Sequence, residues 1–337
     1  MNTSNKGFPA LLSDYFQKYL PSQRGVSMNT IKSYRDTFVV FFRFLERKEQ
    51  IYPNKISFQA LNSDLVERFL EWLELENNNS ISTRNHRLAT LHSFMKYVMA
   101  QHPEFIEQCS KVLAIRSKKR IQKPPVYLSV EEVKCVFSQP DIKTAQGLRD
   151  LALLTLLYDS GCRVQELIDL TWFDMRIDKP STITLTGKGG KSRIVPLMPD
   201  TSNILFAYKQ TLRRADNNKN IFLNQSSEKL SRSGVEYIVE KYVTVASEEM
   251  PSLKEKKVTP HVYRHSKAMH LTQADVNIIY IRDFLGHSSI QVTERYARAD
   301  SRSKRKALEK ASKNIVPESS YSPDEEQELL AFLKELL

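Results

Sequence analysis

The stretch HVYRHSKAMH, residues 261–270, places three histidines and one arginine within ten positions. Such a cluster suits either a metal site or a set of hydrogen-bond donors for an anion. On a helix, His261, Arg264 and His265 stand three and four residues apart and therefore share one face. His270 comes nine residues after His261 and falls near the same face.

The spacing favours an anion over a metal ion. The zinc motif HExxH is absent, and the ten residues contain no Asp or Glu that could complete a hydrolytic zinc site. The positive charge of Arg264 would repel a dication, whereas its planar guanidinium can pair with two phosphate oxygens at once. The stretch therefore predicts half of a phosphate-binding site.

Downstream, FLGHSSIQVTERYARAD (284–300) contains a candidate nucleophile. Gly286 is expected to end a helix, and His287 to occupy the turn that follows it. Tyr296 comes nine residues after His287. A lone tyrosine is usually structural, and its phenol, with a pKa of about 10, attacks poorly unless its proton is removed and charge on the attacked phosphate is offset. Arginine and histidine donors would meet the second requirement.

Upstream, STITLTGKGGKSRIVPL (181–197) alternates as two strands around a glycine-rich turn. The segment GKGGKS is not a P-loop, because Leu185 stands where that motif requires glycine. Lys188 at the turn could reach a phosphate or enter a groove. Without other evidence, Lys188 would be interpreted as a solvent-exposed lysine at a hairpin turn.

The remaining pattern predicts helices. SVEEVKCVF (129–137) has Ser129 as a cap and Glu132 in the capping-box position. A buried helix is expected through GLRDLALLTLLYDSG, and another in CRVQELIDL. In the first third of the chain, apolar residues at three- and four-residue steps predict a bundle, in which the aromatic stripe is core rather than a base-stacking surface. Its helices are expected near 8–20 and over 28–48, 62–77 and 82–101.

Charge and composition suggest a polyanionic partner. The net charge is +11, and segment 317–337 carries six acids against one base, so residues 1–316 carry +16. No apolar run approaches the roughly 20 residues of a membrane span, and the N-terminus has no signal-peptide pattern. Three well-separated cysteines, Cys109, Cys135 and Cys162, fit free thiols in a reducing cytoplasm.

Five motifs, GCRVQEL, TGKGGKSR, HVYRHS, LGHSS and ERYAR, resemble in this order the motif series of the tyrosine recombinases, the integrase family that includes the Xer proteins. The resemblance covers nearly the whole chain and implies a mainly α fold. It implies a helical core-binding domain (1–115), a basic linker (116–125), an α+β catalytic domain with a small antiparallel sheet (126–316) and an acidic, amphipathic tail helix (317–337).

The resemblance also implies the site residues. The family's catalytic positions fall on Arg163, Lys188, His261, Arg264, His287 and the nucleophile Tyr296, and all six hold the family's residue type. Glu166 and His265 are expected to support the site, and His270 to be a packed helix residue. For contact with DNA, the basic candidates are Arg35, Arg43, Arg84, Arg87, Lys118, Lys119 and Arg120.

The implied reaction is attack of Tyr296 on a DNA phosphodiester, which leaves a 3′-phosphotyrosyl link and a free 5′-hydroxyl. Arg163 and Arg264 would hold the non-bridging oxygens, Lys188 would protonate the leaving oxygen, His261 would act as general acid/base near the tyrosine, and His287 would donate to the phosphate. The resemblance implies no metal ion, ATP or other cofactor. It implies double-stranded DNA as partner and a homotetramer on specific DNA sites, in a cytoplasmic, nucleoid-associated protein without a membrane anchor.

Two questions stay open in the sequence. The amphipathic segment 324–337 could dock on a neighbouring subunit or fold back on its own domain. The run HSKAMHL departs from the HSFATHL usual in Xer proteins, and no additional arm-binding domain precedes the first helices, so a recombinase or transposase of a mobile element is expected. The alternatives are a chromosome-dimer Xer recombinase, a type IB topoisomerase-like relaxing enzyme and a catalytically silent DNA-binding regulator.

Overall fold

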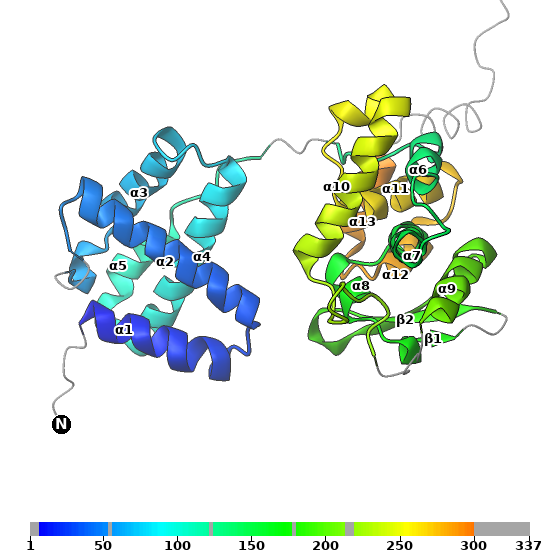
Figure 1. Cartoon of the computed structure of the whole chain (residues 1–337). Helices are drawn as coiled ribbons and strands as arrows, with labels where there is room; N and C mark the ends of the chain where they lie inside the picture. Colours follow the sequence, from blue (N-terminus) through cyan, green and yellow to red (C-terminus); the bar gives the residue numbers. More distant parts are fainter. Residues whose placement is uncertain (1–6, 53–55, 121–123, 177–179, 213–218, 300–337) are drawn as a thin grey trace, which may run out of the picture. The chain divides into compact units, whose positions relative to one another are not determined.

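The computed structural model describes residues 7–52, 56–120, 124–176, 180–212 and 219–299. The chain divides into two compact units, residues 1–122 (unit 1) and 123–337 (unit 2). Both units are mainly helical, and unit 2 adds a small antiparallel sheet (Figure 1), which confirms the predicted fold class. Within the described ranges, no helix is both long and apolar enough to cross a membrane.

Unit 1 is a helical bundle whose helices begin at polar caps. The side chains of Ser27, Asn62 and Ser80 accept hydrogen bonds from backbone N–H groups in the first turns of α2, α3 and α4. The elements are α1 (Phe8–Asp14), the π-type helix η1 (Tyr15–Gln23), α2 (Met28–Lys48), η2 (Phe58–Ala60), α3 (Ser63–Leu75), α4 (Ile81–Gln101), η3 (Pro103–Phe105) and α5 (Ile106–Leu113).

Aromatic rings form the centre of unit 1. Phe94 on α4 is fully buried, and its ring makes edge contacts with Phe8, Tyr15 and Phe38. Edge-on packing of this kind favours aromatic pairs beyond the area they bury. The aromatic stripe of α2 thus belongs to the core, as its spacing predicts. The helix expected near 8–20 instead divides into α1 and η1.

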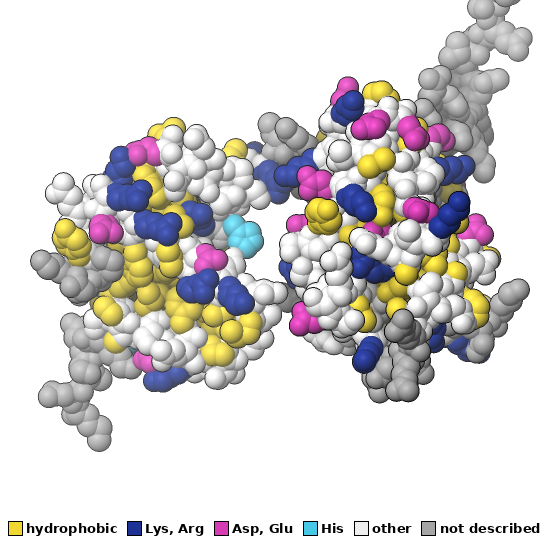
Figure 2. Space-filling model, viewed as in Figure 1, with side chains coloured by type: hydrophobic (Ala, Val, Ile, Leu, Met, Phe, Trp, Pro, Cys, Tyr) yellow, Lys and Arg dark blue, Asp and Glu magenta, His cyan; other side chains and the backbone are white. Residues whose placement is uncertain are grey.

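Part of the apolar face of α1 reaches the surface. Figure 2 shows hydrophobic side chains gathered on one face of unit 1, over α1 and α2. Phe8, Leu12, Phe16 and Phe42 line an open groove there, with little polar surface around them. The described residues of unit 1 therefore cover only part of the hydrophobic face of α1.

Unit 2 is built around α7, which is apolar on all sides. Residues 151–157 of α7 are all buried, and the helix contacts α6, α9 and α11. Figure 1 shows it end-on in the middle of unit 2. The helical elements are α6 (Val130–Phe137), α7 (Ala145–Asp159), α8 (Val164–Asp169), η4 (Trp172–Asp174), η5 (Lys188–Gly190), α9 (Pro199–Thr211), α10 (Arg232–Glu249), η6 (Pro251–Glu255), α11 (Pro260–Gln273), α12 (Ile278–Leu285) and α13 (Ile290–Ala299).

The sheet consists of β1 (Met175–Arg176), β2 (Thr182–Thr186) and β3 (Ser192–Pro196), in that order and antiparallel. The hairpin of β2 and β3 is as predicted, and β1 is an additional short strand. Ile183 pairs with Val195 and Leu185 pairs with Arg193. Because side chains two residues apart share a face, Arg193 stands on the buried side of the sheet, where its charge requires a partner.

Several expectations lie outside the described residues. The tail 317–337, with its helix 324–337, and the end of the predicted catalytic domain are among them, as is part of the linker 116–125. The assignment of 1–115 as a core-binding domain and of 126–316 as a catalytic domain stays a prediction.

Replacing Phe94 with alanine should lower the free energy of unfolding of unit 1 by about 3–5 kcal/mol, because a cavity replaces the central ring. The chain has two tryptophans, Trp72 in unit 1 and Trp172 in unit 2. In a Trp172→Phe background, Trp72 fluorescence in a urea titration reports on unit 1. Leu75→Ala is the matched control, since Leu75 is 79% exposed. Equal midpoints for the two variants would contradict the central role of Phe94.

Candidate active site

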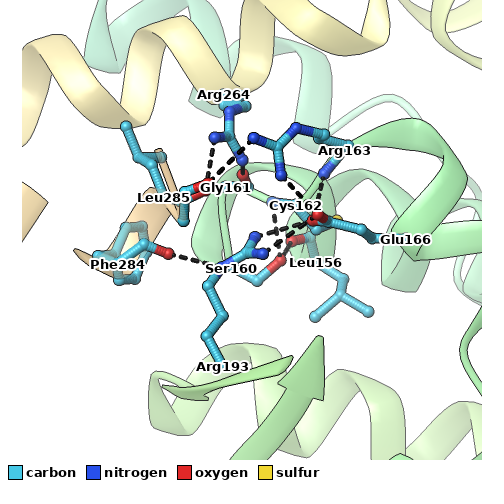
Figure 3. A network of polar contacts seen from close by, with 11 residues as sticks. Leu156, Ser160, Gly161, Cys162, Arg163, Glu166, Arg193, Arg264, Phe284 and Leu285 are labelled. Atoms are coloured by element: carbon cyan, nitrogen blue, oxygen red, sulfur yellow. Dashed lines mark hydrogen bonds and ion pairs between the residues drawn. The ribbon is translucent and has the colours of Figure 1, made fainter. Parts of the chain in front are cut away.

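Three arginines from distant segments converge on the end of α12. They come from the start of α8, from β3 and from α11, and each donates to one of three successive backbone carbonyls, those of residues 284–286 (Figure 3). The last carbonyls of a helix have no partner within the helix and carry its negative dipole end. The contacts are Arg193 Nε to Phe284 O at 2.9 Å, Arg264 Nη2 to Leu285 O at 2.5 Å and Arg163 Nη2 to Gly286 O at 3.1 Å.

Glycine is required where the arginines approach. Gly286 ends α12 in the left-handed conformation, with φ of 62°, as predicted for a helix stop. A Cβ at this position would lie 3.0 Å from Nη1 of Arg193. Gly161, with φ of 55°, supplies the carbonyl that accepts from Arg264 Nη1 at 2.6 Å. A side chain at either position would strain the backbone and displace neighbouring atoms.

Glu166 on α8 is the carboxylate of this cluster. Its oxygens accept from Arg163 Nη1 at 2.7 Å and from Arg193 Nη1 and Nη2 at 3.1 and 2.8 Å. The backbone N–H of Arg163 also donates to it, at 2.9 Å. Burial by itself would raise the pKa of Glu166, but the hydrogen bonds from Arg193 and Arg163 outweigh it and hold the pKa at about 2. The carboxylate is therefore ionised at neutral pH.

Arg264 is buried to 1% exposure, yet its contacts are neutral carbonyls. Burial, and then the charges of Arg163 and Arg193, lower its pKa to about 10. A value of 10 still leaves the guanidinium protonated at neutral pH. Three positive charges therefore lie around the single carboxylate of Glu166, with Arg264 buried and Arg163 and Arg193 partly exposed. Such an excess of positive charge favours binding of an anion.

Tyr296 on α13 is also buried, at 1% exposure. Its hydroxyl lies 2.7 Å from Nδ1 of His265 on α11, and Nη2 of Arg295 lies 3.2 Å from Nε2 of the same ring. The guanidinium of Arg295 also stacks over the tyrosine ring at 5.2 Å. Burial raises the pKa of Tyr296, while the charges of Arg295 and Arg264 lower it in part.

His287 lies in the turn between α12 and α13, where the sequence predicts it. Its ring stacks on that of Tyr296, with centroids 6.4 Å apart, and Nδ1 lies 2.8 Å from Oγ1 of Thr293. Burial, followed by the charges of Arg264 and Arg163, lowers the pKa of His287 to about 3. The ring is thus neutral at neutral pH and has one N–H to donate.

The three histidines of 261–270 have separate surroundings. The ring of His261 packs edge-on against that of His265, with centroids 4.4 Å apart, and its side chain is exposed. The ring of His270 is packed in the fold, with Nδ1 2.8 Å from the hydroxyl of Tyr158. Among the residues that the structure describes, no three His, Cys, Asp or Glu side chains are grouped so that they could hold a metal ion.

The structure places Lys188 at the start of the short turn η5, between β2 and β3. The backbone of this turn is adjacent to the site, because Cβ of an alanine at Gly187 would lie 3.1 Å from Oε1 of Glu166. The side chain of Lys188 lies outside the described structure. Four of the other predicted site residues, Arg163, Arg264, His287 and Tyr296, are brought together directly, and their roles stay predictions.

The basic residues nominated in unit 1 fall into two groups. Arg84 is buried, with its guanidinium 3.2 Å from Glu74 and 3.4 Å from the carbonyl of Arg116. Arg87 is half-buried, and its Nη1 has no hydrogen-bond partner in the described structure. Exposed positions are held by Arg35, Arg43, Lys118, Lys119 and Arg120, of which Arg35 pairs with Asp36 and Lys118 with Glu74.

Three residues have a larger part in the site than the sequence indicated. Arg193 is the last residue of the motif TGKGGKSR, but strand alternation alone does not show that it meets Glu166. His265 was expected only to support the site, although it shares a helix face with His261. Arg295 directly precedes the tyrosine, and only the packing of α13 on α11 brings it to His265.

Comparison with known proteins identifies relatives over the whole chain. The model of the phage integrase family matches residues 127–303, and that of the phage integrase N-terminal SAM-like domain matches residues 14–102. The integrase/recombinase y4rC of Sinorhizobium fredii is 35% identical over 334 residues, which cover 99% of this chain and 100% of that protein. Tyrosine recombinase XerC of Myxococcus xanthus is 32% identical, over 85% of this chain and 92% of that protein.

A solved structure has the same fold. The crystal structure of the XerH site-specific recombinase, bound to palindromic difH substrate in a post-cleavage complex, superposes with a TM-score of 0.66. The match covers 89% of this chain and 84% of that chain, at 21% sequence identity. The helical units and the small sheet are thus an architecture already observed.

Replacing Glu166 with glutamine should destabilise unit 2 by on the order of 3 kcal/mol near neutral pH, because the pKa of Glu166 falls from 4.5 to about 2 on folding. A lowered folded-state pKa contributes stability above pH 4.5 and loses it as the pH falls through about 2. The gap between wild type and Glu166→Gln should therefore narrow below pH 4.5.

Urea titrations from about pH 7 to about pH 3 would measure this gap, with Trp172 as the reporter in a Trp72→Phe background. Glu236→Gln is the matched control, since Glu236 is exposed on α10 of the same unit. A gap that stays constant across the acidic range would show that Glu166 does not carry the charge assigned to it.

Proposed function

We propose a role for each site residue on the premise that this chain belongs to the phage integrase family, the tyrosine-type site-specific recombinases, which are enzymes that cleave and rejoin DNA. The proposal is that double-stranded DNA is the substrate, and that Tyr296 forms the covalent link to it. The observation that carries the proposal is the gathering of Arg163, Arg264, His287 and Tyr296 around the end of α12.

In the proposed step, the oxygen of Tyr296 attacks the phosphorus of a DNA phosphodiester. A tyrosine–phosphorus bond forms, the bond from phosphorus to the 5′-oxygen breaks, and the phenol proton is lost while the leaving oxygen gains one. The energy of the broken bond is kept in the 3′-phosphotyrosyl link. A 5′-hydroxyl of a partner strand can then reverse the step. Because Tyr296 is buried, the structure around it must open before a phosphate reaches it.

The arginines are assigned to the non-bridging phosphate oxygens. A guanidinium has five N–H donors, and the described contacts of Arg264 use two of them. Those two contacts hold the group without cancelling its charge, so that the remaining donors are oriented in advance of the reaction. Preorganised donors of this kind stabilise the charge that develops in the transition state. Arg163 is oriented in the same way by Glu166 and the carbonyl of Gly286.

The remaining roles follow from position. Lys188 would be the general acid for the leaving 5′-oxygen, since its turn adjoins Gly187 and Glu166. His287 would donate to the phosphate from the turn before α13. His261, exposed beside the ring of His265, would act as general acid/base near the tyrosine. No metal ion or ATP enters this scheme, because the arginines carry the electrostatic task.

Unit 1 would hold the DNA through the ends of α2 and α4. Lys32, His86 and Arg87 line one hollow where these helices begin, and the positive end of a helix favours phosphate. Of the basic residues nominated from the sequence, Arg87 lines this hollow and is the preferred candidate. Arg84 faces Glu74 instead, so its role as a DNA contact stays a prediction, as do those of Arg35, Arg43, Lys118, Lys119 and Arg120.

Within the family, we assign the chain to a mobile element. The run HSKAMHL differs from the usual Xer sequence, and the relative y4rC, named an integrase/recombinase, matches over the full length. A chromosome-resolving Xer role is the second candidate, because XerC of Myxococcus xanthus is 32% identical. Cleavage of duplexes from the ends of the element that carries the gene, rather than of chromosome-dimer sites, would separate the two.

Replacing Tyr296 with phenylalanine should abolish the covalent complex with a nicked suicide substrate, because the attacking oxygen is removed. The complex would be detected as DNA-linked protein on a denaturing gel, in buffer with EDTA. Tyr280→Phe is the matched control, since Tyr280 is 69% exposed on α12. Trapping by the Tyr296→Phe protein, or no trapping by the wild type, would refute the nucleophile assignment.

The tail 324–337 is proposed to dock on a neighbouring subunit of a tetramer, because five apolar residues line one face of its sequence. Removal of residues 318–337 should then leave cleavage of the suicide substrate intact and abolish assembly of four subunits on paired sites, as measured by light scattering. Normal assembly of the shortened chain would show that the tail folds back on its own domain.

A further inference from the structure

We propose that His265 positions the nucleophile by donating a hydrogen bond from Nδ1 to the phenol oxygen of Tyr296, and that Arg295 selects the ring form that can donate. This inference rests on the proposed function, in which Tyr296 attacks the phosphate. It assigns to His265 a defined electronic role, in place of general support for the site.

The two ring nitrogens of His265 have partners of different kinds. Nε2 lies 3.2 Å from Nη2 of Arg295, and Nδ1 lies 2.7 Å from the hydroxyl of Tyr296. A guanidinium can only donate, so Nε2 must be the acceptor in the first contact. The proton of a neutral imidazole is then on Nδ1. Nδ1–H therefore donates to the phenol oxygen.

The ring is neutral in this arrangement. Burial, followed by the charges of His261, Arg295 and Arg264, lowers the pKa of His265 to about 3. A protonated ring would also direct an N–H at Nε2 against the N–H of Arg295. Both the surroundings and the geometry thus select one form, the neutral ring protonated on Nδ1.

The groups that face His265 and Tyr296 are cationic or become so on protonation. They are His261 and Arg264 on α11, Arg295 on α13 and His287 in the turn before α13. A donor to the phenol oxygen and nearby positive charge both favour the phenolate, whereas burial favours the neutral phenol. His265 therefore offsets part of the cost of burying the nucleophile.

The donor role excludes a base role for His265. Its Nδ1 already carries a proton and cannot accept that of the phenol, while its Nε2 is occupied by Arg295. The phenol proton must leave to another group, and this role is assigned to His261, whose ring contacts that of His265. The two histidines on one helix face thus have different roles: His265 holds the phenol oxygen, and His261 exchanges the proton.

The tautomer can be measured on the full-length protein without DNA. In ¹⁵N-histidine-labelled protein, nitrogen chemical shifts distinguish a protonated ring nitrogen from a bare one, and the His265→Asn spectrum assigns the His265 signals by their loss. We expect a protonated Nδ1 and a bare Nε2 at neutral pH. A ring protonated on Nε2 would overturn the proposal, and the tautomer itself is read from the spectrum of the wild-type protein, with the variant used only to assign the signals.

Two substitutions distinguish the effect of losing the hydrogen-bond donor from the effect of losing the imidazole ring. The amide nitrogen of asparagine can take the place of Nδ1, whereas that of glutamine reaches the place of Nε2 and leaves the phenol without its donor. Single-turnover cleavage of the suicide substrate by His265→Gln should fall about ten- to hundredfold, and that by His265→Asn by less than about threefold, because a hydrogen bond to a charged group is lost only in the first.

The pH profile provides the diagnostic readout. The acid limb of the His265→Gln profile should move to higher pH, because the phenolate is harder to form without its donor. A His265→Gln profile equal to wild type, or equal loss in both variants, would overturn the inference. Failure of the proposed function is distinguishable, because the wild type would then form no Tyr296-dependent complex, while the nitrogen spectra would still report the tautomer.

Discussion

The site depends on the hydrogen bonds that three arginines make to the backbone carbonyls at the end of α12. A helix end leaves its last carbonyls without partners, and here those of residues 284–286 accept from Arg193, Arg264 and Arg163. Segments that are distant in the sequence are thereby joined at one point. Gly286 makes this possible, since its φ of 62° disfavours other residues and a Cβ there would lie only 3.0 Å from Nη1 of Arg193.

Bringing three cations together, one of them fully buried, is costly, and the site offsets that cost only in part. Glu166 pairs with Arg163 and Arg193, while Arg264 is held by carbonyls alone. The excess of positive charge is a structural preference for an anion, and in the proposed function that anion is the scissile phosphate. The same arrangement orients the arginine forks before substrate arrives, which is the form of electrostatic stabilisation that costs no reorganisation during the reaction.

The proposed nucleophile belongs to the same network. The ring of Tyr296 stacks against that of His287, and its hydroxyl lies 2.7 Å from Nδ1 of His265. Since Arg295 occupies the other nitrogen of His265, the residue that precedes the nucleophile in the chain also sets the ring form that holds it. In the proposed mechanism, the position and protonation of the Tyr296 oxygen therefore depend on the two contacts that His265 on α11 makes with α13.

The sequence by itself determined the mainly helical class, the cap at Ser129, the hairpin around Lys188 and the family, because these depend on local spacing and on the order of short motifs. It could not show that Arg193 meets Glu166, that Arg84 pairs inside unit 1, or that His265 rather than His261 touches Tyr296. In the sequence, Arg193 and Glu166 are 27 residues apart, His265 and Tyr296 are 31 apart, and Arg84 and Glu74 are 10 apart. The two residues of each pair lie on different helices or strands. Helix periodicity shows which residues share a face, but only the packing of α8, β3, α11, α12 and α13 decides which atoms come within hydrogen-bonding distance and hence which charges are paired.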